Sequence, residues 1–172
     1  MNLIECNEGR SAEILTILND AILNTTALYD YKPRTLEMMA IWIDAKRCGD
    51  YPVIGVTSDA GELMGFASYG PFRAWPAYKY TVEHSLYVAQ PYRRLGVGSR
   101  LLRALIERAA VQNYHAVIGG VDSSNAASIV LHERFGFEHV ATFREVGFKF
   151  GNWLDLCFYQ LLLSTPHAPV DG

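Results

Sequence analysis

The chain has 172 residues, half of them hydrophobic and 12% aromatic, so it can bury one sizeable core and general disorder is excluded. The net charge of −3 and the lack of a long lysine or arginine run disfavour nucleic acid or an anionic membrane surface as the main partner. No apolar stretch approaches the roughly 20 residues that span a bilayer. Because the first residues also lack a secretion-signal pattern, we expect a cytoplasmic protein.

Patterns in the first half of the chain predict a strand, two helices and a hairpin. A short strand is expected at residues 3–6, followed by a helix with Ser11 as its N-cap. Its apolar residues recur at helical spacing: Ile14, Leu15, Leu18, Ala21 and Ile22. A second helix is expected between Thr35 and Gly49, with the apolar stripe Leu36, Met39, Ala40 and Ile43. Residues 53–57 and 62–69 flank a turn and predict a β-hairpin.

Strands and helices alternate in the second half. The expected strands are 81–88, 116–121, 137–146 and 154–162, and the expected helices are 98–112 and 125–135. No repeat or linker divides the chain. The order predicts a single α/β domain, residues 1–163, in which helices flank a mixed central sheet. The tail, residues 164–172, contains two prolines and is expected to be flexible.

The most informative segment is 88–99, which runs from a predicted strand into a predicted helix. Gly96 and Gly98 let the backbone curl tightly there and present its N–H groups. A helix N-terminus adds unpaired donors and a partial positive charge, and Arg93 and Arg94 add full charges. Together these parts suit a pyrophosphate.

Other phosphate-binding loops do not fit this spacing. A P-loop needs Gly-Lys-Ser/Thr, which is absent, and a dinucleotide fingerprint needs a small residue where Leu101 stands. Gly-x-Gly alone also fits an ordinary strand-to-helix connection.

The turn has the form Arg-x-x-Gly-x-Gly, and the segment 125–137 follows some thirty residues later. This pair of motifs resembles the GNAT superfamily of N-acetyltransferases. The resemblance implies the GNAT fold and acetyl-CoA as co-substrate, with its pyrophosphate on the turn and its pantetheine near Asn125. Position 132 lies two helical turns after Asn125 and shares its face of the helix. The cofactor-binding residues so implied are Leu86, Tyr87, Val88, Arg93, Arg94, Leu95, Gly96, Val97, Gly98, Ser99, Asn125 and Arg134.

His132 stands where the superfamily usually has tyrosine, which is similar to the phosphinothricin and methionine sulfoximine acetyltransferase subgroup. The segments 69–73, 81–88 and 147–155 resemble the same subgroup, and the likeness covers residues 3–162. It implies a homodimer. Residues 74–76 lie where such proteins vary, so the subgroup is better defined than the substrate.

Transfer of an acetyl group to an amine needs a base that makes the amine neutral. Glu83 is the candidate, provided that burial or its neighbours raise its pKa; alternatively it is a strand carboxylate paired with Arg73 or Lys79. A backbone N–H near Tyr87 or Val88 is expected to stabilise the oxyanion. His132 is either a proton donor to the departing thiolate or a structural residue beside the cofactor.

Arg73 and Lys149 are candidates for binding anionic groups of the acceptor, or else are solvated or core side chains. The full set of predicted substrate-binding residues is Phe72, Arg73, Trp75, Pro76, Ala77, Tyr78 and Lys149. The leading function is acetylation of the α-amino group of an amino acid or analogue. The alternatives are acetylation of protein N-termini or peptides, and a non-catalytic acyl-CoA-binding module.

No metal site is expected. Metal-ligand spacing is absent among the three cysteines and among the remaining histidines, which we interpret as reduced thiols and as structural or surface residues. The residues concerned are Cys6, Cys48, Cys157, His84, His115, His139 and His167.

Overall fold

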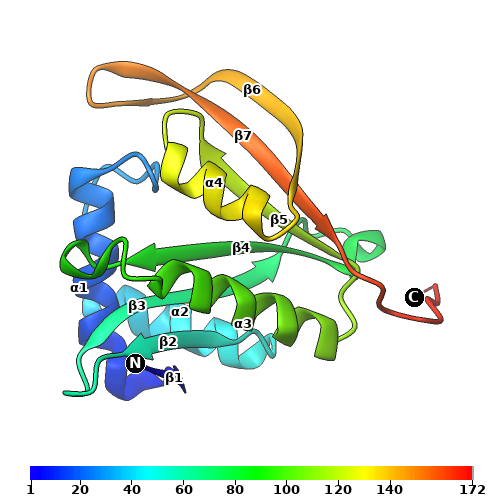
Figure 1. Cartoon of the computed structure of the whole chain (residues 1–172), viewed down its shortest axis with the longest axis horizontal. Coiled ribbons are helices and arrows are strands. Elements are labelled where there is room, and N and C mark those ends of the chain that lie inside the picture. The colour runs from blue at the N-terminus through cyan, green and yellow to red at the C-terminus, as the bar shows by residue number, and fades with distance from the viewer. Residues whose placement is uncertain (172) are drawn as a thin grey trace. The chain divides into compact units, whose positions relative to one another are not determined.

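The computed structural model describes residues 1–171 and confirms the predicted order of strands and helices (Figure 1). The strands are β1 (Asn2–Glu5), β2 (Val53–Thr57), β3 (Leu63–Pro71), β4 (Thr81–Val88), β5 (Ala116–Asp122), β6 (Glu138–Lys149) and β7 (Asn152–Leu162). The helices are α1 (Ser11–Asn24), α2 (Leu36–Cys48), α3 (Val97–Val111) and α4 (Ala126–Arg134). The seven strands form one mixed sheet in the order β1-β2-β3-β4-β5-β7-β6, so the predicted α/β class is correct.

The chain forms two compact units. The first comprises Met1–Ser68 and Ser85–Leu105, and the second comprises Tyr69–His84 and the residues from Ile106 onward. The division passes through β4 after His84.

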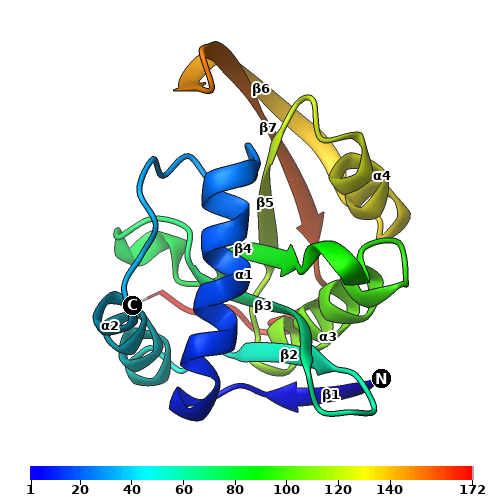
Figure 2. The same ribbon diagram turned by 90° about the vertical axis from the view of Figure 1, so that its left-hand side faces the viewer.

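The core of the first unit lies between two helices and the antiparallel strands β1, β2 and β3. Figure 2 shows α1 and α2 side by side. Ile14, Ile17, Met39 and Ile43 pack in this core against residues of β2 and β3. The predicted stripe of α2 is right at Met39 and Ile43, but its other members are wrong, because Leu36 and Ala40 are exposed.

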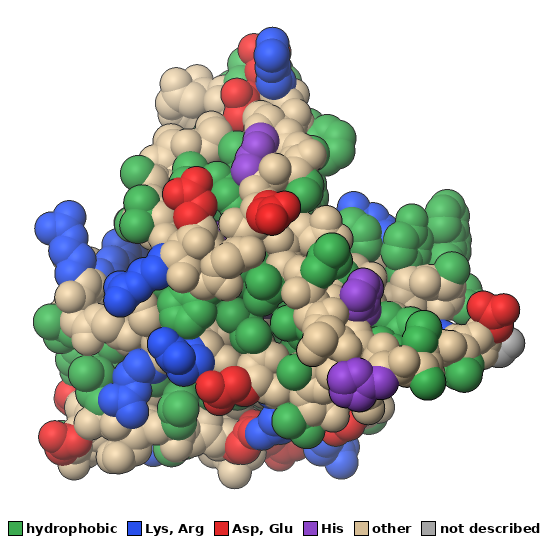
Figure 3. All heavy atoms as spheres, turned by 45° about the vertical axis from the view of Figure 1, so that its right-hand side comes forward, with side chains coloured by type: hydrophobic (Ala, Val, Ile, Leu, Met, Phe, Trp, Pro, Cys, Tyr) green, Lys and Arg blue, Asp and Glu red, His purple; other side chains and the backbone are tan. Residues whose placement is uncertain are grey.

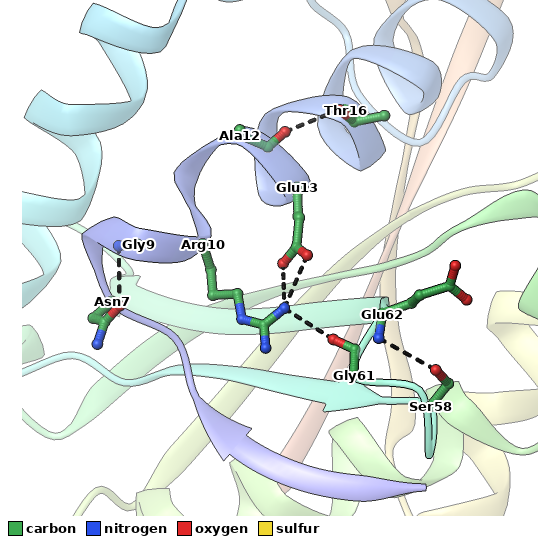
Figure 4. Close-up of polar contacts among 9 residues, drawn as sticks. All are labelled: Asn7, Gly9, Arg10, Ala12, Glu13, Thr16, Ser58, Gly61 and Glu62. Atoms are coloured by element: carbon green, nitrogen blue, oxygen red, sulfur yellow. Dashed lines mark hydrogen bonds and ion pairs between the residues drawn. The ribbon is translucent and has the colours of Figure 1, made fainter.

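The entry into α1 differs from the prediction. Ser11 is not an N-cap but already has helical backbone angles, because a 3-10 turn, η1 (Glu8–Arg10), precedes the helix. Asn7 caps that turn by accepting the Gly9 N–H (Figure 4). Arg10 then joins the turn to the β2–β3 loop, since its Nη1 donates to both Glu13 carboxylate oxygens and to the Gly61 carbonyl (Figure 4).

In the second unit, β5 pairs with β4 in parallel and with β7 antiparallel, and α4 lies against β5. The parallel pairing runs from Thr81↔Ala116 to His84↔Gly119. Residues 81–84 therefore have a fixed register against the buried strand predicted at 116–121.

The β6–β7 hairpin is longer than predicted, because pairing continues to Lys149↔Asn152. Its turn consists of Phe150 and Gly151, whose φ angles of 53° and 77° are both positive, as a tight two-residue hairpin turn requires. A phenylalanine there is atypical, which explains why the sequence pattern missed the turn.

The predicted flexibility of the tail stays a prediction. Its residues make specific hydrogen bonds: Thr165 Oγ1 donates to the Tyr114 carbonyl (2.6 Å), and the Val170 N–H donates to the Tyr80 hydroxyl oxygen (3.2 Å).

Candidate active site

The predicted phosphate-binding turn lies in the first unit and connects β4 to α3. Gly96 has a φ of 83°, a left-handed conformation that favours glycine, and the space beside it is open. The Arg100 N–H donates to the Gly96 carbonyl at 3.1 Å and begins the ladder of α3. By helix geometry, the preceding N–H groups of Val97, Gly98 and Ser99 have no acceptor one turn back, so they are available to an anion.

The two arginines of this turn differ. Arg93 folds back on its own strand: its Nε donates to the Val88 carbonyl at 3.3 Å, and its Nη2 lies 3.7 Å from Asp20 Oδ2. Arg94 is exposed and has a left-handed backbone, with a φ of 64°. A strained residue at a turn of this kind is typical of a functional site. Arg94 is therefore the better placed of the two to meet a phosphate from solvent.

Glu83 lies on β4 in the second unit, where it is half-buried. Burial raises the pKa of its carboxyl group, and the nearby Arg73 guanidinium acts in the opposite direction. Arg73 Nη1 lies 3.9 Å from Glu83 Oε2, so the predicted pairing of these residues is present. The pair is loose and partly exposed, so it leaves Glu83 able to take up a proton.

The guanidinium of Arg73 is also held by the segment from which it comes. Its Nη1 donates to the Phe72 carbonyl at 2.7 Å, and its Cζ lies 4.1 Å from the centre of the Phe72 ring. Phe72 in turn packs edge-on against Tyr78. Glu83, Arg73, Phe72 and Tyr78 are thus brought together, whereas the Trp75 side chain is 74% exposed.

Asn125 and His132 share one face of α4, as their spacing predicts. Asn125 is the N-cap: its Oδ1 accepts the Ser128 N–H at 3.1 Å, which leaves its Nδ2 as the donor for a ligand. One turn further on, the Ser128 carbonyl lies 2.7 Å from Nδ1 of His132. Ser128 therefore links the two predicted residues.

His132 also meets a residue to which the sequence assigned no functional role. Its Nε2 lies 3.0 Å from Nε2 of His84, and both rings are buried, at 4% and 8% exposure. Gly119 lies beneath them, where a Cβ atom would come within 2.7 Å of the His132 Nε2 and 2.9 Å of the His84 Nε2. Only glycine leaves room for this pair.

The glycines at 119 and 120 are the signal that sequence reasoning missed. Consecutive glycines inside a buried strand mark close approach by other groups. A Cβ on Gly120 would lie 3.4 Å from Glu83 Oε1, on the opposite face from the histidines. Asp122, at the end of β5, was also missed: its Oδ2 is buried without a partner, and its Oδ1 accepts the Ser124 N–H.

The remaining predicted residues are placed individually. Lys149 is 3% exposed, with its Nζ 5.0 Å from the centre of the Phe150 ring, so it is not a solvated lysine. Arg134 is exposed in the last turn of α4. Leu86, Tyr87 and Val88 are half-buried along β4. The expected N–H donor for the oxyanion near Tyr87 or Val88 stays a prediction.

Residues 1–171 also bear on metal binding and on membrane association. In that range no group of three or more His, Cys, Asp and Glu residues is arranged to hold a metal ion. No helix there is long and apolar enough to cross a membrane. On the face drawn in Figure 3, acidic and basic side chains are interspersed with hydrophobic ones.

Comparison with known proteins identifies the family. The profile of the acetyltransferase (GNAT) family matches residues 19–137, which include the phosphate-binding turn, Glu83, Asn125 and His132. The chain belongs to the GNAT acetyltransferase family. The predicted fold and the predicted class of enzyme, an acyltransferase, are therefore confirmed.

Relatives within the GNAT family extend over most of the chain. The L-methionine sulfoximine/L-methionine sulfone acetyltransferase of Pseudomonas paraeruginosa is 47% identical over 157 residues, which is 91% of each chain. The phosphinothricin N-acetyltransferase of Streptomyces coelicolor is 36% identical, covering 84% of this chain and 85% of its own. A solved Salmonella typhimurium structure with its cofactor acetyl-CoA has a TM-score of 0.95 and 37% identity, covering 99% of this chain and 98% of that one. The predicted subgroup resemblance is thereby confirmed.

We expect the two buried histidines to make the fold acid-sensitive. Burial lowers the pKa of both rings below their ordinary value of 6.5, so below that pH the unfolded chain binds protons that the folded one does not. Stability should therefore fall as the pH drops from 7.5 to 5.5, by roughly 1–3 kcal/mol, measured by urea unfolding. Glu83, whose pKa is raised, offsets part of this loss.

The matched variants are His84→Gln, which should lose less stability over this pH range, and His167→Gln at an exposed position, which should lose as much as the wild type. Equal losses in all three proteins would show that the buried pair is not responsible.

Proposed function

We propose that the protein transfers the acetyl group of acetyl-CoA to the α-amino group of an amino acid or analogue of the methionine sulfoximine or phosphinothricin type. The observation that carries this proposal is the position of Glu83. It is a half-buried carboxylate with a raised pKa, and it lies 3.9 Å from a guanidinium suited to an acceptor's anionic group. The names of the relatives support the same acceptor class.

The residues present fit acetyl-CoA. The open left-handed turn at Gly96, the first N–H groups of α3 and the exposed Arg94 suit a pyrophosphate. Asn125 keeps its Nδ2 for the pantetheine amides, as the family resemblance implies, because only its Oδ1 is used in capping. When bound, acetyl-CoA supplies the acetyl group as a thioester.

Glu83 prepares the acceptor. Its carboxylate accepts a proton from the substrate ammonium, directly or through a water molecule, which frees the nitrogen lone pair. The nitrogen then forms a bond to the thioester carbonyl carbon and gives up a second proton to solvent, the carbon–sulfur bond breaks, and the thiolate leaves. A carboxylate with an ordinary pKa is a weak base for this step, and the burial of Glu83 makes it stronger.

Arg73 binds the acceptor's anionic group. Its guanidinium is held over Phe72 and by the Phe72 carbonyl, so little conformational freedom is lost on binding. Phe72 and Tyr78, which pack edge to face, form a wall beside it. Lys149, which is buried, is a second candidate cation for the same recognition.

The acceptor class is tested by following thiol release from acetyl-CoA over a panel of free amino acids, methionine sulfoximine, methionine sulfone, phosphinothricin and short peptides. We expect turnover with the free amino acids or analogues, and little with peptides. Higher kcat/KM on peptides would favour N-terminal acetylation instead. Tight acetyl-CoA binding without turnover on any acceptor would indicate a binding module.

Replacement of Glu83 by glutamine should lower kcat by about 10²- to 10⁴-fold, the usual contribution of a general base, while the affinity for acetyl-CoA is retained. In the wild type, kcat/KM should decline on the acidic side at a pH above the ordinary range of glutamate, because burial raises the pKa of this carboxyl. Exposed Glu138→Gln serves as the control and should behave as wild type. Retention of more than a tenth of kcat by Glu83→Gln would remove Glu83 as the base.

We also propose a homodimer and a cytoplasmic location. The β6–β7 hairpin exposes many large apolar side chains, among them Phe143, Val146, Phe150 and Trp153, and such a surface is typical of a subunit contact. The free thiols of the three cysteines are typical of a reducing compartment.

The dimer is tested with two valine-to-glutamate substitutions. Val146 on β6 is 53% exposed and Val111 at the end of α3 is 77% exposed. Val146→Glu should convert the dimer to a monomer in light scattering, because a charge is buried in the contact, whereas Val111→Glu should leave it unchanged. A wild type that is monomeric at all concentrations would contradict the proposal.

A further inference from the structure

The contacts of the buried histidine pair determine where its protons lie. A carbonyl oxygen can only accept, so His132 Nδ1, 2.7 Å from the Ser128 carbonyl, carries a hydrogen. A neutral imidazole has one N–H, so Nε2 of His132 is then an acceptor. Its neighbour at 3.0 Å, Nε2 of His84, must be the donor. Nδ1 of His84 is left as a bare lone pair, and it is buried without a hydrogen-bond partner.

The surroundings keep both rings neutral. Burial lowers the pKa of each ring. His132 lowers the pKa of His84 further, whereas the hydrogen bond to the Ser128 carbonyl acts in the opposite direction on His132. Phe137 packs edge-on against both rings, and Tyr159 of β7 packs against His132. Tyr159 is a titratable group on this side, and burial raises the pKa of its hydroxyl, with smaller contributions from Glu133 and Cys157. The titratable ring of His139 packs against Tyr159 as well. Glu83, the neighbouring residue on β4, points to the opposite face of the strand.

We propose that His84 is a positioning residue for acetyl transfer. By donating to Nε2, it holds His132 as a neutral ring that is protonated on Nδ1. The departing thiolate therefore receives no proton from His132. Both nitrogens of His132 are occupied, one by the Ser128 carbonyl and one by the His84 N–H. His132 thereby fixes α4 against β5 above Gly119. Because Asn125 is the N-cap of α4, the position of Asn125 is fixed as well. The role in transfer rests on the proposed function, but the arrangement of protons does not.

The protons are tested first by ¹⁵N NMR of the imidazole nitrogens in the wild-type protein between pH 6 and 8. We expect His132 to be protonated on Nδ1 and His84 on Nε2, with neither ring titrating in this range. Protonation of His132 on Nε2, or titration of either ring near 6.5, would overturn the proposal. This measurement needs no acceptor and no turnover. Its result therefore tests the arrangement of protons even if the proposed acceptor class is wrong.

The positioning role is tested with two substitutions of His84. Glutamine carries an N–H at nearly the position of Nε2 and should preserve the His132 tautomer, the acetyl-CoA Kd and kcat. Leucine has no donor, so Nε2 of His132 should lose its partner while Nδ1 keeps its hydrogen on the Ser128 carbonyl. The Nε2 resonance of His132 should therefore shift and the acetyl-CoA Kd should rise by about tenfold, while the shape of the kcat–pH profile is retained. Each Kd is measured by calorimetry without an acceptor.

Two results would contradict this role. If His132 were the proton donor, kcat would fall as the pH rises through its pKa, and His84→Leu would shift that decline. If His84 were merely a packing residue, leucine and glutamine would give the same Kd and the same His132 spectrum.

Discussion

The alternation of side chains along β4 is the constraint on which the chemistry of the second unit depends. Glu83 and His84 are neighbours, so the strand directs them to opposite faces of the sheet. The parallel register sets them against Ile118 and Gly119 of β5, and the two glycines of β5 make room on both faces. A one-residue slip of this register would place each group on the wrong face. The parallel pairing of residues 81–84 with β5 therefore fixes two different environments, one for Glu83 and one for His84.

Those environments change pKa values in opposite directions by the same physical means. Burial disfavours the charged form of any group, so it raises the pKa of the Glu83 carboxyl and lowers the pKa of both imidazoles. For a general base the shift is useful, because the carboxylate becomes more basic. For the histidines it stabilises a neutral hydrogen-bonded pair. Only for Glu83 is the effect of burial on the pKa limited by a neighbouring charge, because the positive Arg73 guanidinium lies beside its carboxylate.

The fold was predictable because its signals are local. Apolar spacing located the α-helices and strands of residues 1–171. The errors lie in the α2 stripe, where Leu36 and Ala40 are exposed, and at two turns of unusual chemistry: the 3-10 turn before α1, and the Phe150-Gly151 turn that lengthens the β6–β7 hairpin. The stripe of Asn125 and His132 was predictable from helical periodicity. The pair of His84 with His132 was not, because 48 residues separate them and only the pairing of β4 with β5 brings them together.

His132, which stands where the family resemblance implies a tyrosine, is accommodated by His84 and Gly119. A phenolic hydroxyl has one oxygen to satisfy, whereas a buried imidazole has two nitrogens on opposite sides of the ring. Helix α4 supplies one partner through the Ser128 carbonyl, but a helix cannot reach the far nitrogen of its own residue. The partner must come from the sheet, which supplies His84, and the ring needs space above the sheet, which Gly119 leaves. His132 is thus one member of a three-residue set, in which His84 contacts its far nitrogen and Gly119 leaves room for both rings.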